Sequence, residues 1–245
     1  MEKSLGISVI LPIFSEEEVL YGVLESLDKN IGGHMLEVIG IVSPKSAGKT
    51  FEICAELSKK YGYFSYEKQE VNPGLGNAVR QGMKKARGNY VLLMDSDGEM
   101  EAGSAKLMAE KIVQNPGLDL VVASRWKNGG SFEGYGLVKY WLNFAYQRVC
   151  RLIFSQKISD FTLGYKIMRA EFAHGIKWEG AMHEIAHETT LAPIICGAAV
   201  DEVPTKWAAR ASGSSKNSIG NNFGYLAVFF RMAWLKLTGA KRCMG

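Results

Sequence analysis

The chain has 245 residues, of which 47% are hydrophobic and 22% are charged. These proportions are ordinary for a globular protein, so a sizeable core in one large domain is expected. The formal net charge is +4, which favours anionic ligands or an anionic membrane face. This charge is too small to indicate a protein that binds nucleic acid.

The sequence lacks a run of about 18 apolar residues, so no segment is expected to span a bilayer by itself. The N-terminal apolar stretch is short and soon followed by Pro12 and three glutamates, which is unlike a secretory signal. The four cysteines lie far apart without metal-type spacing, and we expect reduced thiols. Together these features predict a cytoplasmic protein.

The first half of the chain alternates apolar runs with helical stretches. Strands are predicted at residues 7–13, 37–42, 63–66, 90–94 and 119–123. Apolar residues at helical spacing predict helices at residues 16–29, 49–61, 75–86 and 105–114. Strands that alternate with helices indicate an α/β fold, in which helices flank both faces of a mostly parallel sheet.

The second half of the chain is less regular. Residues 129–136 are rich in glycine and predict a loop, and residues 208–222 form a second, polar loop. Between and after them we expect helices at residues 137–154, 182–196 and 223–237, and strands at residues 164–168 and 199–203. The predicted organisation is one domain over residues 1–220, followed by an amphipathic C-terminal helix and tail over residues 221–245.

Three carboxylates follow the clearest buried strand, in the sequence Asp95-Ser96-Asp97-Gly98-Glu99. Ligands of open α/β sheets bind at the carboxyl ends of the strands, where these side chains lie. Mg²⁺ is typically held by one or two carboxylates, with phosphates and water in the other positions. The same residues also suit a solvated turn, so the cluster alone leaves both interpretations open.

Further segments occur in a fixed order around this cluster. They are residues 8–16, 72–78, 82–97, 124–125, the Asp-x-Thr-x-Gly segment 160–166, the Glu-Val-Pro segment 202–204 and the Arg-x-x-Gly-x-Ser-Lys segment 210–216. Their order and spacing resemble family 2 glycosyltransferases of the GT-A fold, and most of all the catalytic domains of dolichol-phosphate mannose synthases. The resemblance covers roughly residues 5–220 and implies a Rossmann-like fold and a nucleotide-sugar donor.

The resemblance also implies a metal site and catalytic residues. Asp95 and Asp97 would form an Asp-x-Asp motif that holds Mg²⁺ or Mn²⁺ at the donor diphosphate, with Glu99 as a candidate third ligand. The residues to which it assigns catalytic roles are Asp97, Arg125, Lys139 and Arg210.

Two binding sites follow from the same resemblance. The nucleotide-sugar site would comprise Pro12, Phe14, Glu16, Ser43, Gly74, Asn77, Asp95, Ser96, Asp97, Arg210 and Lys216. The acceptor site would comprise Arg125, Lys139, Asn143 and Asp160. Arg210 and Lys216 would close over the diphosphate, because an Arg fork suits phosphate oxygens and Lys adds a point charge.

One segment departs from the family. After the second strand the family has an acidic pair that contacts the nucleoside, whereas residues 42–50 here contain Lys45, Lys49 and no carboxylate. The choice between a GDP-sugar and a UDP-sugar is therefore open.

Two other motifs point to different chemistry. Ser46-Ala47-Gly48-Lys49-Thr50 imitates a phosphate-binding loop, but Ser43 stands where that motif needs glycine. His183-Glu184-Ile185-Ala186-His187 matches the zinc-protease motif, with both histidines on one helix face. The extended protease motif fails, so a zinc hydrolase is the alternative from another class, and a lining of the acceptor pocket is the milder interpretation.

The two aromatic helices at residues 137–154 and 223–237 carry basic residues such as Arg148 and Arg231. They are consistent with helices that lie in a membrane interface, and equally with helices that cover the sheet. The expected function is an inverting transfer of a sugar from a GDP- or UDP-sugar to a polyprenyl phosphate, on the cytoplasmic membrane face and without nucleic acid. The main alternative is a soluble enzyme with a hydroxyl acceptor, which would need a general base such as Asp160 or Glu188.

Overall fold

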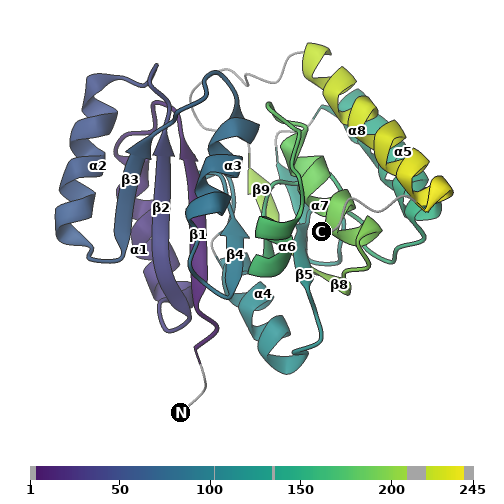
Figure 1. The fold of residues 1–245 in the computed structure, drawn as a ribbon, viewed down its shortest axis with the longest axis horizontal. Coiled ribbons are helices and arrows are strands. Elements are labelled where there is room, and N and C mark those ends of the chain that lie inside the picture. The colour runs from purple at the N-terminus through teal and green to yellow at the C-terminus, as the bar shows by residue number, and fades with distance from the viewer. Residues whose placement is uncertain (1–3, 102, 134–135, 209–218, 240–245) are drawn as a thin grey trace.

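The computed structural model describes residues 4–101, 103–133, 136–208 and 219–239. Its centre is a seven-stranded sheet in the order β3-β2-β1-β4-β7-β5-β8. Every strand is parallel to its neighbours except β7, which runs antiparallel between β4 and β5. This mostly parallel sheet, flanked by helices, confirms the predicted α/β class (Figure 1).

The elements follow the predicted alternation closely. The strands of the sheet are β1 (Ile7–Ile13), β2 (Met35–Val42), β3 (Phe64–Lys68), β4 (Tyr90–Leu93), β5 (Leu120–Ser124), β7 (Lys166–Arg169) and β8 (Val200–Pro204). The helices are α1 (Val19–Ile31), α2 (Gly48–Lys60), α3 (Leu75–Lys85), α4 (Gly103–Gln114), α5 (Leu137–Phe154), α6 (Ala170–Gly175), α7 (Ile185–Ile195) and α8 (Ile219–Thr238).

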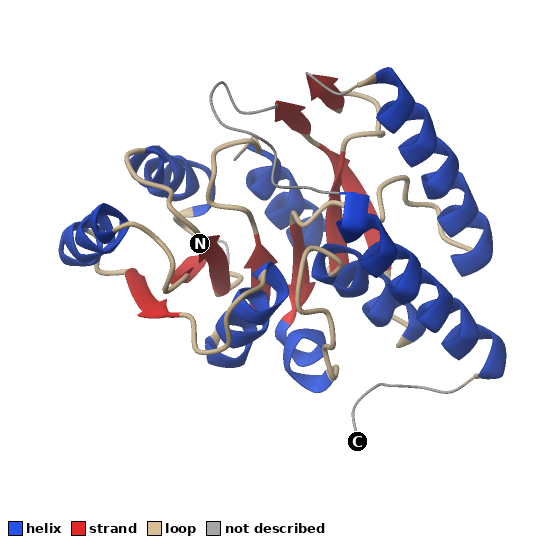
Figure 2. Ribbon diagram, turned by 90° about the horizontal axis from the view of Figure 1, so that it is seen from above, coloured by secondary structure: helices blue, strands red, loops and turns tan. Residues whose placement is uncertain are grey.

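The sheet separates two apolar cores. Successive side chains of a strand point to opposite faces, so Val9 and Leu11 of β1 enter one core and Ile10 enters the other. Helices α1, α2 and α4 cover the first face, and α3, α5, α6, α7 and α8 contribute to the second (Figure 2). Because both faces are covered, the central strands are apolar on both sides, which is why their sequences lack alternation.

Three short elements were not predicted. The glycine-rich stretch expected to be a loop contains β6 (Ser131–Glu133), which pairs in parallel with β9 (Lys206–Ala208). Helix α6 has six residues and directly follows β7. β6 and β9 have three residues each, which is too short to show a period, so the loop prediction for residues 129–136 is wrong at β6. The loop prediction for residues 208–222 is wrong from Ile219, where α8 begins.

Helices α5 and α8 lie side by side at one end of the molecule (Figure 1). Both present large apolar side chains to solvent. They include Leu137, Val138, Trp141, Leu142 and Leu152 on α5, and Phe223, Phe230, Trp234 and Leu237 on α8. Among the helices that the structure describes, none has the length and hydropathy needed to cross a membrane.

The cysteines differ from expectation at one position. Cys54 and Cys150 are buried free thiols, as predicted. Cys196, just after α7, is disulfide-bonded, so the prediction that all the cysteines are reduced is wrong for this residue. The wide separation of the four cysteines along the sequence gave no sign of this bond, because disulfide partners have to be close only in the folded structure.

A buried carboxylate ties together three segments of the sheet's first half. Glu37 of β2 accepts a hydrogen bond from Ser8 Oγ (2.7 Å) and three from Arg87, including its backbone N–H (2.8 Å). Burial alone would raise the pKa of Glu37, but the hydrogen bonds from Arg87 and Ser8 outweigh it and hold the pKa below 4.5. The charged form of Glu37 is therefore favoured by the fold.

We predict that Glu37→Gln lowers the free energy of unfolding at pH 7 by about 1–3 kcal/mol, because charge-assisted hydrogen bonds to a buried group are lost. The stabilisation depends on a lowered pKa, so it is present above pH 4.5 and disappears as pH falls through the folded-state pKa. Urea unfolding at pH 7 and at pH 3 measures both effects. Glu25→Gln, which removes an exposed pair with Lys60, is the control and should change stability little. An equal loss for both variants would contradict the prediction.

Candidate active site

The ends of β1, β2 and β4 meet at one edge of the sheet. Ser96, which follows β4, donates its hydroxyl to the carbonyl oxygen of Pro12 at 2.5 Å. The backbone N–H of Ser43 donates to the carbonyl of Ile13 at 2.9 Å, and the Ser43 hydroxyl accepts from Asn72 Nδ2 at 3.2 Å. The structure therefore brings together Pro12, Ser43 and Ser96, which the sequence placed in one nucleotide-sugar site.

Asp95 and Asp97 leave β4 through a tight turn at this edge. Asp97 Oδ1 accepts the backbone N–H of Glu99 at 3.0 Å, and Gly98 has φ +75°, a conformation that favours glycine. Asp95 lines a small cavity of about 20 Å³ together with Gly164 and residues of α3 and α7, roughly the room of a single water molecule. Two carboxylates at a strand end are a donor set that fits Mg²⁺ or Mn²⁺ beside a diphosphate.

The side chain of Glu99 is bound by a residue of β9. Its Oε2 accepts the indole N–H of Trp207 at 3.0 Å. In the described residues, no three His, Cys, Asp or Glu side chains are grouped so that they could hold a metal. Asp95 and Asp97 thus stay the predicted ligands, and the three-carboxylate set with Glu99 is not assembled in this conformation.

The other donor-site residues lie on either side of this edge. Glu16 receives the backbone N–H of the exposed Phe14. Gly74 has φ +132° and precedes α3, and the N–H of Asn77 in the first turn of α3 donates to Ala181 O at 3.3 Å. Arg210 and Lys216, predicted to close over the diphosphate, lie outside the described residues.

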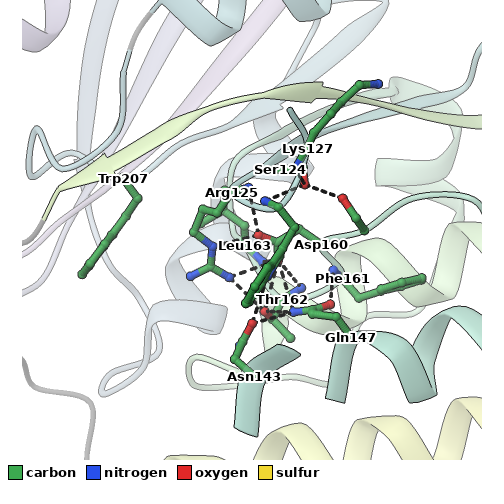
Figure 3. Close-up of polar contacts among 12 residues, drawn as sticks. Ser124, Arg125, Lys127, Asn143, Gln147, Asp160, Phe161, Thr162, Leu163 and Trp207 are labelled. Atoms are coloured by element: carbon green, nitrogen blue, oxygen red, sulfur yellow. Dashed lines mark hydrogen bonds and ion pairs between the residues drawn. The ribbon is translucent and has the colours of Figure 1, made fainter. Parts of the chain in front are cut away.

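A buried ion pair dominates the region predicted to bind the acceptor. Asp160 is fully buried and receives Arg125 Nε at 2.8 Å and Arg125 Nη2 at 3.0 Å, while Thr162 takes a third guanidinium bond at 3.1 Å (Figure 3). Burial would raise the pKa of Asp160, but the Arg125 charge and hydrogen bonds outweigh it and lower that pKa. The pair fixes the guanidinium in one orientation at the end of β5.

Helix α5 brings Lys139 and Asn143 to this pair. Partial burial lowers the pKa of Lys139, and the nearby Arg125 charge adds to the effect, whereas Glu99 opposes it. Asn143 accepts the indole N–H of Trp126 at 3.1 Å. The four predicted acceptor residues therefore lie in one region, and the positive charge of Arg125 acts on Lys139.

Sequence reasoning missed several supporting residues. Gln147 of α5 donates to Thr162 Oγ1 (2.8 Å) and accepts from Phe161 N (2.8 Å), which positions the segment that carries Asp160 (Figure 3). Lys166 of β7 is fully buried, and burial lowers its pKa to about 7. A lysine within an apolar strand was the signal that could have revealed it. Its Nζ donates to Ala186 O (2.5 Å), Thr189 Oγ1 (3.1 Å) and Thr190 Oγ1 (2.5 Å).

The two competing motifs have structural partners instead of ligands. Lys49 of the phosphate-loop imitation forms ion pairs with Glu17 and Glu18. His187 of the zinc-protease motif is fully buried, with Nδ1 at 2.9 Å from Phe161 O and Nε2 at 3.0 Å from Tyr146 Oη. Burial lowers the pKa of His187 to about 4, so the ring is neutral. Both ring nitrogens are engaged, which leaves no lone pair directed at a zinc ion.

Known proteins were compared with the chain by sequence. A dolichol-phosphate mannosyltransferase of Pyrococcus furiosus is 28% identical over 235 residues, which cover 94% of this chain and 64% of that protein. A dolichyl-phosphate beta-glucosyltransferase of Trichomonas vaginalis is 27% identical over 135 residues, covering 51% of this chain and 42% of that protein. The chain therefore spans less than two thirds of the length of either relative.

Solved structures agree on the fold. Glucosyl-3-phosphoglycerate synthase from Mycobacterium tuberculosis, in complex with UDP, has a TM-score of 0.71 and 16% identity over 94% of this chain and 80% of that one. The same enzyme with Mn²⁺, UDP and phosphoglyceric acid has a TM-score of 0.70 and 16% identity over 93% and 78% of the two chains. The sequence model described as "Glycosyl transferase family 2" matches residues 8–176. The chain belongs to this family of glycosyltransferases.

Proposed function

We propose that the chain transfers a sugar, with inversion, from a nucleoside diphosphate to a polyprenyl phosphate at a membrane surface. The observation that carries the proposal is the cation pair of Arg125 and Lys139 at the foot of helix α5, whose outer face is apolar and exposed. An acceptor that is anionic at one end and apolar along its length matches this arrangement.

The cation pair and the apolar face are joined by aromatic rings. The Arg125 guanidinium lies 5.2 Å from the centroid of Phe132. From there the ring contacts continue without a gap to Trp141, which is 62% exposed. The centroid distances are 4.4 Å for Trp126–Phe132, 4.8 Å for Trp126–Tyr140 and 5.6 Å for Tyr140–Trp141. An isoprenoid chain has an apolar path away from its phosphate along these rings.

The state of the candidate bases also supports a phosphate acceptor. Asp160 is held in its ion pair with a lowered pKa, which makes it a weak proton acceptor. Glu188 is fully buried and bound to Arg231 at 2.5 Å and to backbone N–H groups. A hydroxyl acceptor needs a base, whereas a phosphate is already anionic at neutral pH. Neither carboxylate is placed to deprotonate a hydroxyl.

In the proposed reaction, an oxygen of the acceptor phosphate attacks the anomeric carbon while the bond to the donor diphosphate breaks. The electron pair of that bond leaves with the nucleoside diphosphate. Asp95 and Asp97 would hold Mg²⁺ or Mn²⁺, which would neutralise charge on the leaving diphosphate. Arg125 and Lys139 orient the attacking phosphate and reduce the repulsion between two anionic substrates.

The names of two relatives, a dolichol-phosphate mannosyltransferase and a dolichyl-phosphate glucosyltransferase, support the same class of acceptor. Peripheral membrane contact through α5 and α8, on the cytoplasmic face, is part of the proposal. The apolar residues of α5 are flanked by Arg148 and Arg151, which suit anionic headgroups. A soluble enzyme with a hydroxyl acceptor is the alternative, and the acceptor assays below separate the two.

We predict that Asp95→Asn and Asp97→Asn each abolish Mn²⁺-dependent binding of UDP or GDP, because a neutral amide is a poor ligand for a hard cation. The wild-type chain should bind one of the two nucleotides, and bind it more weakly when EDTA is added. Isothermal titration calorimetry measures this. Asp28→Asn, on the exposed surface of α1, is the control. Metal-independent binding that both variants retain would remove the metal site.

We predict that Arg125→Lys raises the KM for a polyprenyl phosphate about tenfold or more, since lysine cannot reproduce the two-pronged pair with Asp160. The donor KM should change little. Steady-state assays with radiolabelled nucleotide sugar and extraction of the lipid product measure both constants. Transfer to a water-soluble hydroxyl acceptor, with polyprenyl phosphate inert, would favour the soluble alternative.

We predict that the double variant Trp141→Ser and Trp234→Ser weakens binding to vesicles of phosphatidylcholine and phosphatidylglycerol at least about tenfold, because each exposed indole loses a burial contribution of about 1.5–3 kcal/mol. Vesicle sedimentation measures the binding. Nucleotide binding should be unchanged. Equal sedimentation of the variant and the wild-type chain would show that α5 and α8 do not form the membrane contact.

A further inference from the structure

Two carboxylates, Glu184 of the zinc-protease-like motif and Glu188 just after it, hold a backbone turn, the 179–182 turn, in place. Glu188 of α7 accepts the N–H groups of the first two residues of this turn, with 2.6 Å to the N–H of Gly180. Glu184, one helical turn earlier, accepts the N–H groups of the last two residues at 3.0 Å each. Four consecutive backbone donors are thus bound by two side chains.

The 179–182 turn lies directly against the proposed donor segment. The N–H of Asn77 donates to Ala181 O at 3.3 Å. Cβ atoms at Gly74 or Gly76 would overlap carbonyl oxygens of the turn, so backbone meets backbone with no side chain between. Close-packed interfaces of this kind do not deform gradually. A displacement of the turn therefore displaces the start of α3.

Helix α8 completes the support of the turn through one side chain. Arg231 Nη2 lies 2.5 Å from Glu188, which is 0% exposed, and Nη1 pairs with Glu179 of the turn itself. Gly224, in the same helix, packs closely against Glu184: a Cβ at Gly224 would lie 3.1 Å from the Glu184 carboxylate. The helix with the exposed aromatic face thus contacts both carboxylates that hold the turn.

We propose that Arg231 is a positioning residue for donor binding: by bridging Glu188 and the 179–182 turn, it makes nucleotide affinity depend on how α8 is seated. The inference rests on the proposed function, in which Gly74 and Asn77 contact the donor. A membrane-facing helix is then mechanically linked to the nucleotide site on the other side of α7. By linkage, a bound nucleotide favours the same seating of α8.

The test measures Mn²⁺-dependent binding of UDP and of GDP by calorimetry in the full chain, beside the melting temperature. Arg231→Leu should lower the affinity for the nucleotide at least about tenfold, which corresponds to about 1.4 kcal/mol. Arg231→Lys keeps the charge but not the forked contact, and its nucleotide affinity should lie between those of the wild-type chain and Arg231→Leu. Lys236→Leu is the matched control. It removes another anchor of α8, to Ile153 O and Ser155 Oγ at the end of α5, and should leave affinity within about twofold.

A second variant guards against simple unfolding. Arg231→Leu alone leaves the Glu188 carboxylate buried without its arginine, which costs stability. Arg231→Leu combined with Glu188→Gln removes that charge and should recover the melting temperature, while the weakened nucleotide affinity persists. A merely structural role for Arg231 predicts recovery of both.

The possible outcomes are distinct. If the wild-type chain binds neither UDP nor GDP with Mn²⁺, the proposed function fails and the inference fails with it. If the wild-type chain binds a nucleotide and the folded double variant binds it equally well, the inference is overturned and the proposed function stands. Weakened binding in the folded double variant, with Lys236→Leu unaffected, supports the coupling.

Discussion

A buried ammonium joins the sheet to the helix on which the site depends. Lys166 lies on β7, the antiparallel strand inserted between β4 and β5, and binds three oxygens of α7. Burial lowers its pKa, while the charges of Asp160 and Asp95 oppose the shift. An unbonded charge here would be very costly, so α7 has one position in which all three bonds form. The position of α7 in turn sets the positions of Glu184 and Glu188 and of the 179–182 turn that they bind.

In the predicted acceptor site, a buried ion pair likewise fixes the position of a cationic side chain. Arg125 donates two guanidinium hydrogen bonds to the buried Asp160, so its side chain would lose little conformational freedom on binding an anion. Lys139 is exposed on α5, and its pKa is lowered by partial burial and by the Arg125 charge. The two positive charges repel each other, which contributes to that lowered pKa. Under the proposed function, a bound acceptor phosphate would relieve this repulsion, a gain that an isolated exposed lysine would not offer.

The sequence predicted what depends on periodicity and order. Helix α5 was predicted with the bounds that it has, and the grouping of Arg125 with Asp160 followed from the family's motif order. The partners that fix these residues are long-range and carry no local signal. Gln147 bonds across to Thr162, for example, from a helix face that looks like any amphipathic surface. Short strands such as β6 were missed because pairing, not propensity, creates them.

The zinc-protease-like motif shows why spacing is a weak guide to chemistry. The prediction that both histidines share one helix face is wrong, because α7 begins at Ile185 and His183 lies in the turn before it. His187 is buried against Phe161 O and Tyr146 Oη, and Glu184 at the helix N-cap binds the backbone of the preceding turn. The i, i+4 spacing suits a metal only if the face that carries it meets solvent or an open site. Here His187 meets Tyr146 of α5 and Tyr225 of α8, so this position bonds one helix to its neighbours. A polar pattern on a buried helix therefore reflects packing, and under the proposed coupling it acts through the 179–182 turn that it holds beside the start of α3.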